Sequence, residues 1–186
     1  MPLRVFGYGS LMWRPGFEPA AQAPALLRGH HRAFCVRTVH HRGTADRPGL
    51  VLGLAPGGTC HGMLFTVRAS DEVAVRAYLH ERELRWYPVY GEATVTVEPA
   101  EGSGDGGSGD GGSGPVEALT FLPDTRHPDF LGALGDDEIV AIIRDAHGVS
   151  GANADYLRET VAHLAAMGIE EPDLVRLLGR LEQNPA

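Results

Sequence analysis

The order of strand-like and helix-like segments is the feature that most restricts how this chain of 186 residues folds. Strand-like apolar runs dominate the first two thirds, one helical segment lies among them, and helical patterns close the chain. This order lacks the regular alternation of strand and helix that builds a doubly wound parallel sheet. We therefore expect an α+β fold.

Short apolar runs, bounded by turn residues, predict the strands. Pro56-Gly57-Gly58 separates two such runs and is typical of a hairpin turn. The segment from Pro15 to Pro24 is rich in proline, and we expect it to be a loop. The predicted strands are Leu3–Tyr8, Leu26–Thr38, "LVLGLAPGG", "CHGMLFTV", "ATVTVEP" and "VEALTFL".

Helical patterns fill one internal segment and the last third of the chain. We expect Ser70 to cap the first helix, which runs to about Trp86 because Pro88 prevents further extension. The closing helices are "GDDEIVAIIRDAHG", "NADYLRETVAHLAAMG" and "EEPDLVRLLGRLEQ". The middle one places Tyr156, Val161, Leu164 and Met167 at helical spacing and ends at Gly168.

Composition excludes several classes of protein. A formal net charge of −8 argues against a nucleic acid partner, because phosphate binding needs clustered Lys and Arg. No apolar run approaches the roughly 20 residues of a membrane helix, and we expect no signal peptide. Cys35 and Cys60 are too few for a disulfide framework or a zinc site. We expect a cytoplasmic monomer with one domain over 1–186 and a flexible Gly/Ser/Asp loop at about 101–115.

The stretch "VFGYGSLMW", Val5–Trp13, interrupts an apolar strand with two glycines and a serine. Glycines there let the backbone turn sharply and point several N–H groups in one direction, and we expect Gly9 to need a positive φ. Such a turn either binds a carboxylate or oxyanion or simply redirects the chain. The spacing matches neither GxGxxG nor GxSxG, so we expect neither a dinucleotide site nor a nucleophile elbow.

Two glutamates, Glu81 and Glu83, lie near the end of the first predicted helix and point to opposite sides of it. Glu81 precedes Arg85 by four residues, which favours a solvent-facing ion pair. Glu83 flanks Leu79 and Trp86, and a carboxylate held against apolar surface has a raised pKa and can act as a base near neutral pH. Periodicity does not settle which glutamate turns inward, because the helix has a second apolar arc, and an ordinary surface glutamate fits as well.

The remaining polar residues give weaker indications. The histidines include two adjacent pairs whose members point to opposite faces of a strand, so we expect no metal site. Cys35 and Cys60 are expected to be small buried hydrophobes and not nucleophiles. An arginine cluster either receives the carboxylates of a small anionic substrate or lies in solvent near turns. Its members are Arg28, Arg32, Arg37, Arg42 and Arg47.

Taken together, several segments resemble the ChaC-type γ-glutamylcyclotransferases, and in particular their glutathione-specific branch. The matches run in order almost end to end, and the ordered set is more specific than the opening motif alone. The last segment separates this branch from more distant cyclotransferases. The segments are "VFGYGSLMWRP", "RGHHRAF", "HHRGTADRPG", "CHGMLFTV", "YLHERE" and "GVSGANADYLRETVAHLAAMGI".

The resemblance implies a mixed, barrel-like β core with flanking helices, and a substrate pocket over the first turn. It implies a lyase that needs no cofactor and releases 5-oxoproline and Cys-Gly from glutathione, with Glu83 as the catalytic acid and base. The family's pocket tyrosine falls at Val89 here, so either Tyr87 or Tyr90 takes its role. The substrate-binding residues that we predict are Tyr8, Gly9, Ser10, Leu11, Arg42 and Tyr90.

Two other functions fit the same residues. A cyclotransferase of different specificity acts on other γ-glutamyl amino acids or amines and rejects glutathione. A non-catalytic module binds γ-glutamyl compounds without turnover, although a pure binder has no use for an inward, unpaired carboxylate at Glu83.

Overall fold

A computed structural model describes residues 2–100, 114–132 and 134–183 of the chain. By their contacts the residues form two compact units: unit 1 is Met1–Arg32 with Pro56–Leu122, and unit 2 is Ala33–Ala55 with Pro123–Ala186. The division passes through two long strands, which contribute to both units. One domain over 1–186 remains a prediction, and most of the predicted loop at 101–115 lies outside the described residues.

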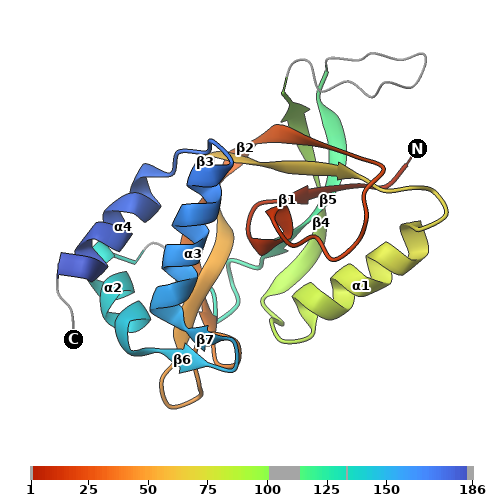
Figure 1. Ribbon diagram of the computed structural model, residues 1–186. Helices are drawn as coiled ribbons and strands as arrows, with labels where there is room; N and C mark the ends of the chain where they lie inside the picture. The colour runs from red at the N-terminus through yellow and green to blue at the C-terminus, as the bar shows by residue number, and fades with distance from the viewer. Residues whose placement is uncertain (1, 101–113, 133, 184–186) are drawn as a thin grey trace. The chain divides into compact units, whose positions relative to one another are not determined.

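Five strands form a closed barrel in the order β1-β3-β2-β4-β5, which confirms the predicted mixed β core (Figure 1). β1 pairs antiparallel with β3, and parallel with β5 where Val5 faces Leu119. β2 pairs antiparallel with β4, where Leu26 faces Glu98. The strands are β1 (Arg4–Gly7), β2 (Ala21–Thr38), β3 (Gly49–Thr66), β4 (Tyr90–Pro99) and β5 (Val116–Pro123).

Large apolar side chains fill the core of unit 1. Phe6 and Phe65 are fully buried on neighbouring strands, and an ideal Cβ on Gly62 would lie only 2.4 Å from the carbonyl oxygen of Gly7. Gly62 therefore lets the backbones of β1 and β3 approach closely. The buried Thr120 hydroxyl donates to the carbonyl of Phe6 at 2.9 Å, which ties β5 to β1.

The predicted hairpin at Pro56-Gly57-Gly58 is wrong, because β3 continues through it as one strand of 18 residues. Gly57 and Gly58 have φ angles of 92° and 72°, a conformation that L side chains rarely adopt. His31 of β2 stays beside this point, with its Nδ1 2.9 Å from the carbonyl oxygen of Gly57. The two glycines thus bend the strand while it keeps its neighbour, as in a β-bulge, and do not reverse the chain.

Two predicted boundaries also differ from the structure. β2 begins at Ala21, inside the segment that proline content marked as loop, and the carbonyl of Pro24 accepts from Ala100 N–H at 2.9 Å. The first helix, α1, is Glu72–Leu84 and follows Asp71 and not Ser70 as its N-cap residue. The Ser70 hydroxyl donates to the Asp71 carboxylate instead of capping the helix.

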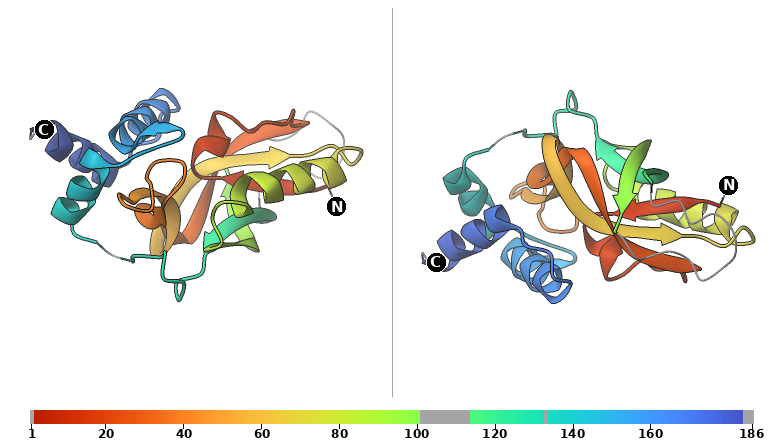
Figure 2. Two further views of the ribbon diagram at one scale, coloured as in Figure 1. Left: turned by 90° about the horizontal axis from the view of Figure 1, so that it is seen from below. Right: turned by 90° about the horizontal axis from the view of Figure 1, so that it is seen from above.

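Unit 2 contains three helices that pack against one another (Figures 1 and 2). They confirm the three predicted closing helices and are α2 (Asp136–Asp145), α3 (Asn153–Ala166) and α4 (Pro172–Gln183). Between α2 and α3 the chain forms a short antiparallel pair, β6 (His147–Gly148) and β7 (Gly151–Ala152), which the sequence did not indicate. No helix within the described ranges is long and apolar enough to cross a membrane.

The buried face of α3 consists of Asn153, Leu157, Thr160 and Leu164. Asn153 is fully buried and bridges both backbone groups of Leu50 on β3. Its Nδ2 donates to the Leu50 carbonyl and its Oδ1 accepts from the Leu50 N–H, each at 2.7 Å. A polar residue therefore occupies the first position of the buried face of α3, because its amide supplies the hydrogen-bond partners of the Leu50 backbone.

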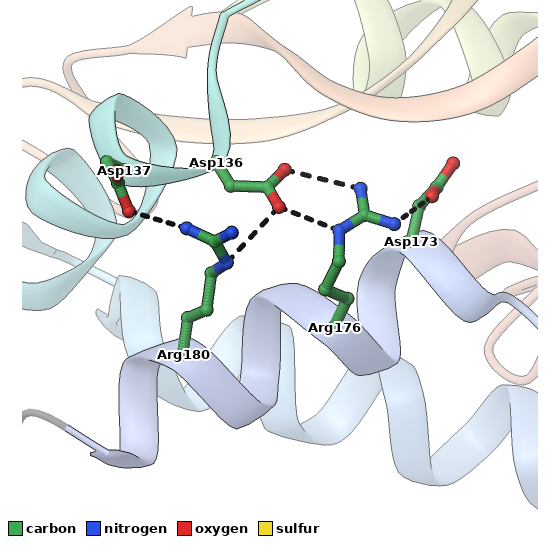
Figure 3. Close-up of polar contacts among 5 residues, drawn as sticks. All are labelled: Asp136, Asp137, Asp173, Arg176 and Arg180. Carbon is green, nitrogen blue, oxygen red and sulfur yellow. Dashed lines mark hydrogen bonds and ion pairs between the residues drawn. The ribbon is translucent and has the colours of Figure 1, made fainter.

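An ion-pair network joins α2 to α4 (Figure 3). The Asp136 carboxylate faces two arginines, with Arg176 Nε at 2.7 Å and Arg180 Nε at 3.4 Å. Hydrogen bonding from Arg176 lowers the pKa of Asp136, and Asp136 stands in the first turn of α2, where the helix dipole favours an anion. The two arginines are about half exposed, so solvent screens the network.

Candidate active site

The turn after β1 forms a short 3₁₀ helix, η1 (Ser10–Met12), that starts immediately after Gly9. Its first closing bond runs from Met12 N–H to the Gly9 carbonyl at 2.9 Å. Leu11 and Met12 are buried, and an ideal Cβ on Gly7 would lie 3.1 Å from Leu11 Cβ. Gly7 is therefore needed because the turn folds back tightly over the end of the strand.

Gly9 serves a different purpose from Gly7. Its φ is −129°, so the expected positive φ is wrong and the turn does not depend on left-handed backbone at this position. An ideal Cβ on Gly9 would meet no atom within 4 Å, so open space lies beside it. Among the residues that the structure describes, the N–H groups of Gly9, Ser10 and Leu11 have no hydrogen-bond acceptor. These three N–H groups are therefore available to donate hydrogen bonds to a ligand beside Gly9.

Arg32 holds the turn from its buried side. The residue is only 3% exposed, and its guanidinium donates to the carbonyls of Tyr8 at 2.6 Å and His61 at 2.5 Å. The Tyr8 hydroxyl in turn donates to the carbonyl of Phe121 at 3.1 Å. Neither alternative for the arginine cluster describes Arg32, which belongs to the internal support of the turn.

Glu81 and Glu83 differ as the helix geometry predicts. The Glu81 side chain is 61% exposed and pairs with Arg85, which confirms the solvent-facing pair. The Glu83 side chain is 23% exposed, and burial raises its pKa while the charge and hydrogen bond of Arg82 oppose that rise. Of the two predicted apolar neighbours, Leu79 is fully buried whereas Trp86 is about half exposed.

Arg82 links Glu83 to the turn, a role that the sequence did not predict. Its Nε lies 3.1 Å from a carboxylate oxygen of Glu83, and its Nη2 donates to Ser10 Oγ at 2.9 Å. One arginine thus connects the two parts of the predicted site, Glu83 and the Tyr8–Leu11 turn. The sequence offers no signal for this role, since Arg82 resembles any polar residue near a helix end.

The two candidate tyrosines lie in the segment between α1 and β4. The rings of Tyr87 and Tyr90 pack edge to face with their centroids 5.7 Å apart, and Tyr90 N–H donates to the Tyr87 carbonyl. Val89, at the position where the resemblance predicts the pocket tyrosine, is 1% exposed. Both tyrosines are partly exposed, so either has room to meet a ligand.

Arg42 belongs to unit 2, whereas the turn, Glu83 and Tyr90 all belong to unit 1. Its Nη1 donates to the carbonyl of Ala152 at 3.1 Å, and its Nη2 lies 3.5 Å from the Glu159 carboxylate. The guanidinium also lies over the ring of Tyr156, 5.2 Å from the centroid. These contacts fix Arg42 against the start of α3, and its role in substrate binding stays a prediction.

Both cysteines are buried free thiols, as predicted. Burial raises the pKa of Cys35 to about 12 and also raises that of Cys60, so neither forms a thiolate at neutral pH. Within the described part of the chain, no three His, Cys, Asp or Glu side chains gather as metal ligands.

Comparison with known proteins supports one family. The model of the family described as ChaC-like protein matches residues 3–184. A glutathione-specific γ-glutamylcyclotransferase of Escherichia coli (strain K12) is 32% identical over 95% of this chain and 71% of its own length. The enzyme of that name from Schizosaccharomyces pombe is 30% identical over 92% of this chain and 87% of its own.

A solved structure shows the same fold. It is described as a γ-glutamyl cyclotransferase specific to glutathione from yeast, and it superposes with a TM-score of 0.84 at 22% identity. The likeness covers 98% of this chain and 96% of the yeast chain. Since the family model spans nearly the whole sequence and two relatives reach 30% identity, this chain belongs to the ChaC family.

Proposed function

We propose that this protein is a γ-glutamylcyclotransferase that cleaves glutathione to 5-oxoproline and Cys-Gly. The observation that carries the proposal is the Glu83 carboxylate, which is largely buried, has a raised pKa and is joined through Arg82 to the turn after β1. The names of the E. coli and S. pombe relatives support glutathione as the substrate.

The proposed reaction is an intramolecular acyl transfer. The α-amino nitrogen of the γ-glutamyl unit attacks its own γ-carbonyl carbon, the five-membered lactam closes, and the bond to the cysteinyl nitrogen breaks. The attacking ammonium loses two protons as it becomes the lactam N–H, and the departing nitrogen gains two as it leaves as the ammonium of Cys-Gly. Glu83 carries these protons one at a time, so the carboxylate is regenerated. Because the nucleophile is part of the substrate, holding it in an attack conformation can remove up to roughly 7–11 kcal/mol of the barrier.

The turn supplies the binding groups in this proposal. Open space lies beside Gly9, and the N–H groups of Gly9, Ser10 and Leu11, which have no acceptor among the described residues, suit either the α-carboxylate or the oxygen of the γ-carbonyl. Donors aimed at the carbonyl oxygen would stabilise the negative charge that develops during attack. Tyr8 contributes its backbone, while its hydroxyl is occupied by the Phe121 carbonyl.

We also assign substrate binding to Arg42 and to Tyr90, with Tyr87 as the alternative. The partial exposure of the two tyrosines supports this assignment. For Arg42 the support is its positive charge, which suits a substrate carboxylate. Its guanidinium already contacts Ala152, Glu159 and the ring of Tyr156. A cytoplasmic monomer that needs no cofactor belongs to the same proposal, and the two free thiols agree with a reducing compartment.

Incubation with glutathione, followed by mass-spectrometric detection of 5-oxoproline and Cys-Gly, tests the proposal. Glu83→Gln should lose about 10²–10⁴ in activity, the range expected for a general base, and should keep its fold. Glu81→Gln is the matched control on the same helix and should be nearly silent, because Glu81 pairs with Arg85 in solvent.

Three outcomes would overturn parts of the proposal. A larger loss in Glu81→Gln than in Glu83→Gln would reverse the assignment of the base. Release of 5-oxoproline from other γ-glutamyl amino acids or amines, but not from glutathione, would change the substrate. Binding of glutathione without turnover would leave a binding module.

A further inference from the structure

We propose that Arg82 is a positioning residue for Glu83, which fixes that carboxylate relative to the Tyr8–Leu11 turn. The inference rests on the proposed function, in which Glu83 is the proton carrier and the turn holds the substrate. It assigns the coupling between these two parts to one guanidinium.

The contacts of Arg82 use the geometry that only an arginine provides. Its Nη2 donates to Ser10 Oγ at 2.9 Å, and its Nη1 donates to the carbonyl of Arg14 at 2.5 Å and to the hydroxyl of Tyr78 at 2.9 Å. The Nε lies 3.1 Å from a Glu83 oxygen on the remaining side. A planar guanidinium with donors on three nitrogens reaches all four groups at once, whereas a lysine ammonium is a single point of charge.

The segment that follows η1 is shaped around the same cluster. Gly16 has a φ of 77°, and an ideal Cβ there would lie 1.9 Å from the Tyr78 hydroxyl. Only glycine leaves room for Tyr78 at that point, and Tyr78 is the side chain that completes the shell around Arg82. The fit of Gly16 to Tyr78 is independent of the contact with Glu83. It indicates that the chain from Ser10 to Gly16 is built to hold this arginine in place.

The charge of Arg82 acts directly on Glu83. Burial raises the pKa of Glu83, and Arg82 opposes this by its charge and its hydrogen bond. Near Glu83, α1 carries the Tyr78 phenol, which bonds to Arg82, and the exposed Glu81, which pairs with Arg85 just past the end of the helix. Its other titratable groups, Glu72, Arg76 and His80, lie toward the start of the helix. The Ser10–Gly16 segment turns a hydroxyl and backbone carbonyls toward Arg82.

β4, which packs on α1, carries Tyr90, Glu92 and Glu98 as its titratable groups, and Glu98 pairs with Arg28. Glu92 is engaged by Arg76 and His80 nearer the start of the helix. Arg82 is therefore the cation that opposes the effect of burial on the Glu83 carboxylate.

The test compares Arg82→Gln, Arg82→Lys and the matched control Arg85→Gln, whose arginine pairs with exposed Glu81 on the same helix. For each variant, kcat and KM for glutathione are measured as functions of pH. The Glu83 carboxyl is titrated separately by ¹³C NMR, and its signal is identified by its absence in Glu83→Gln. A melting curve for each variant shows whether it is folded.

We expect the Glu83 titration and the acid limb of kcat/KM to move to higher pH in Arg82→Gln, with kcat/KM at pH 7 reduced tenfold or more, up to about 10²-fold. Arg82→Lys should keep the acid limb in place, because the charge remains, and should still lose kcat, because the contacts to the turn are gone. Arg85→Gln should match wild type in both measurements. If Arg82→Gln does not fold, Arg82→Lys alone tests the assignment: the acid limb of its kcat/KM profile should stay in place while its kcat falls.

An unchanged Glu83 titration in folded Arg82→Gln, or full kcat in Arg82→Lys, would overturn the assignment. The carboxyl titration needs no turnover, so it judges Arg82 even if wild type leaves glutathione intact. That last result would refute the proposed function and not the effect of Arg82 on Glu83.

Discussion

Replacing Asn153 by alanine should destabilise unit 2 strongly, because one side chain satisfies two buried backbone groups. Asn153 is fully buried, and its amide bonds to both the N–H and the carbonyl of Leu50 at 2.7 Å. Alanine leaves both groups unpaired in a site from which water is excluded. An orphaned buried polar group costs about 1–3 kcal/mol, so two cost about 2–6 kcal/mol.

Urea unfolding and a thermal scan measure this loss. For a chain of this size, a loss of about 4 kcal/mol lowers Tm by about 8–16 °C. The matched control is Thr160→Val on the same face of α3. Thr160 is also fully buried, but its hydroxyl has no hydrogen-bond partner among the described residues.

Valine keeps the shape of threonine and removes a polar group that gains nothing from burial, so Thr160→Val should lie within about 1 kcal/mol of wild type or above it. The reasoning fails if Asn153→Ala unfolds within 1 kcal/mol of wild type, or if Thr160→Val is the more destabilised of the two. Either result would mean that the amide bonds to Leu50 do not support the junction of β3 with α3.

Two further predictions concern the turn and the ion-pair network. In the turn, Gly9→Val should stay folded, because a Cβ there meets no atom within 4 Å, but it should lose most glutathione turnover, since the side chain fills the open space beside the N–H donors. Ser10→Ala keeps its N–H, loses only the contact with Arg82 and should have a milder effect on glutathione kinetics. Near-normal kinetics for folded Gly9→Val would mean that the turn has only a structural role. In unit 2, the pKa of Asp136 is depressed in the folded state, so its ion pairs add stability above the ordinary aspartate pKa of about 3.9 and lose it as pH falls through the lower, folded-state pKa. At pH 7, Asp136→Asn should therefore have a free energy of unfolding lower than wild type by about 1 kcal/mol or less, because the arginines are half exposed. The urea unfolding curves of the two proteins should converge in acid, and a difference that grows in acid would contradict the predicted pH dependence.

The sequence predicted the α+β class and most elements because each has a local cause. Alternation identifies β4, and helical spacing with capping residues identifies the closing helices, so neither needs information about distant residues. The Pro56-Gly57-Gly58 error shows the limit of local cues. Two glycines with positive φ suit a reversing turn and a bulge equally well, and only the continued pairing of β3 with β2 decides between them.

The candidate site was predictable in part for the same reason. The opposite orientations of Glu81 and Glu83 follow from helix geometry alone, and their exposed fractions agree with it. Arg32 and Arg82 were not predictable as supports of the turn, because the acceptors that they bind around the turn are backbone carbonyls and a hydroxyl. Such acceptors leave no complementary charge in the sequence, so an arginine that binds them is indistinguishable from a solvated one.

The seam between β1 and β5 has a consequence for the order in which the molecule is assembled. The Tyr8 hydroxyl and the Phe6 carbonyl beside the turn bond to Phe121 and Thr120, partners 113 and 114 positions away in the chain. During synthesis the N-terminal segment therefore emerges long before the strand that secures it. Contacts of such long range are slow to form, because loop closure must precede them. We therefore expect the barrel to close late, with the turn and its N–H donors reaching their final form only when β1 meets β5.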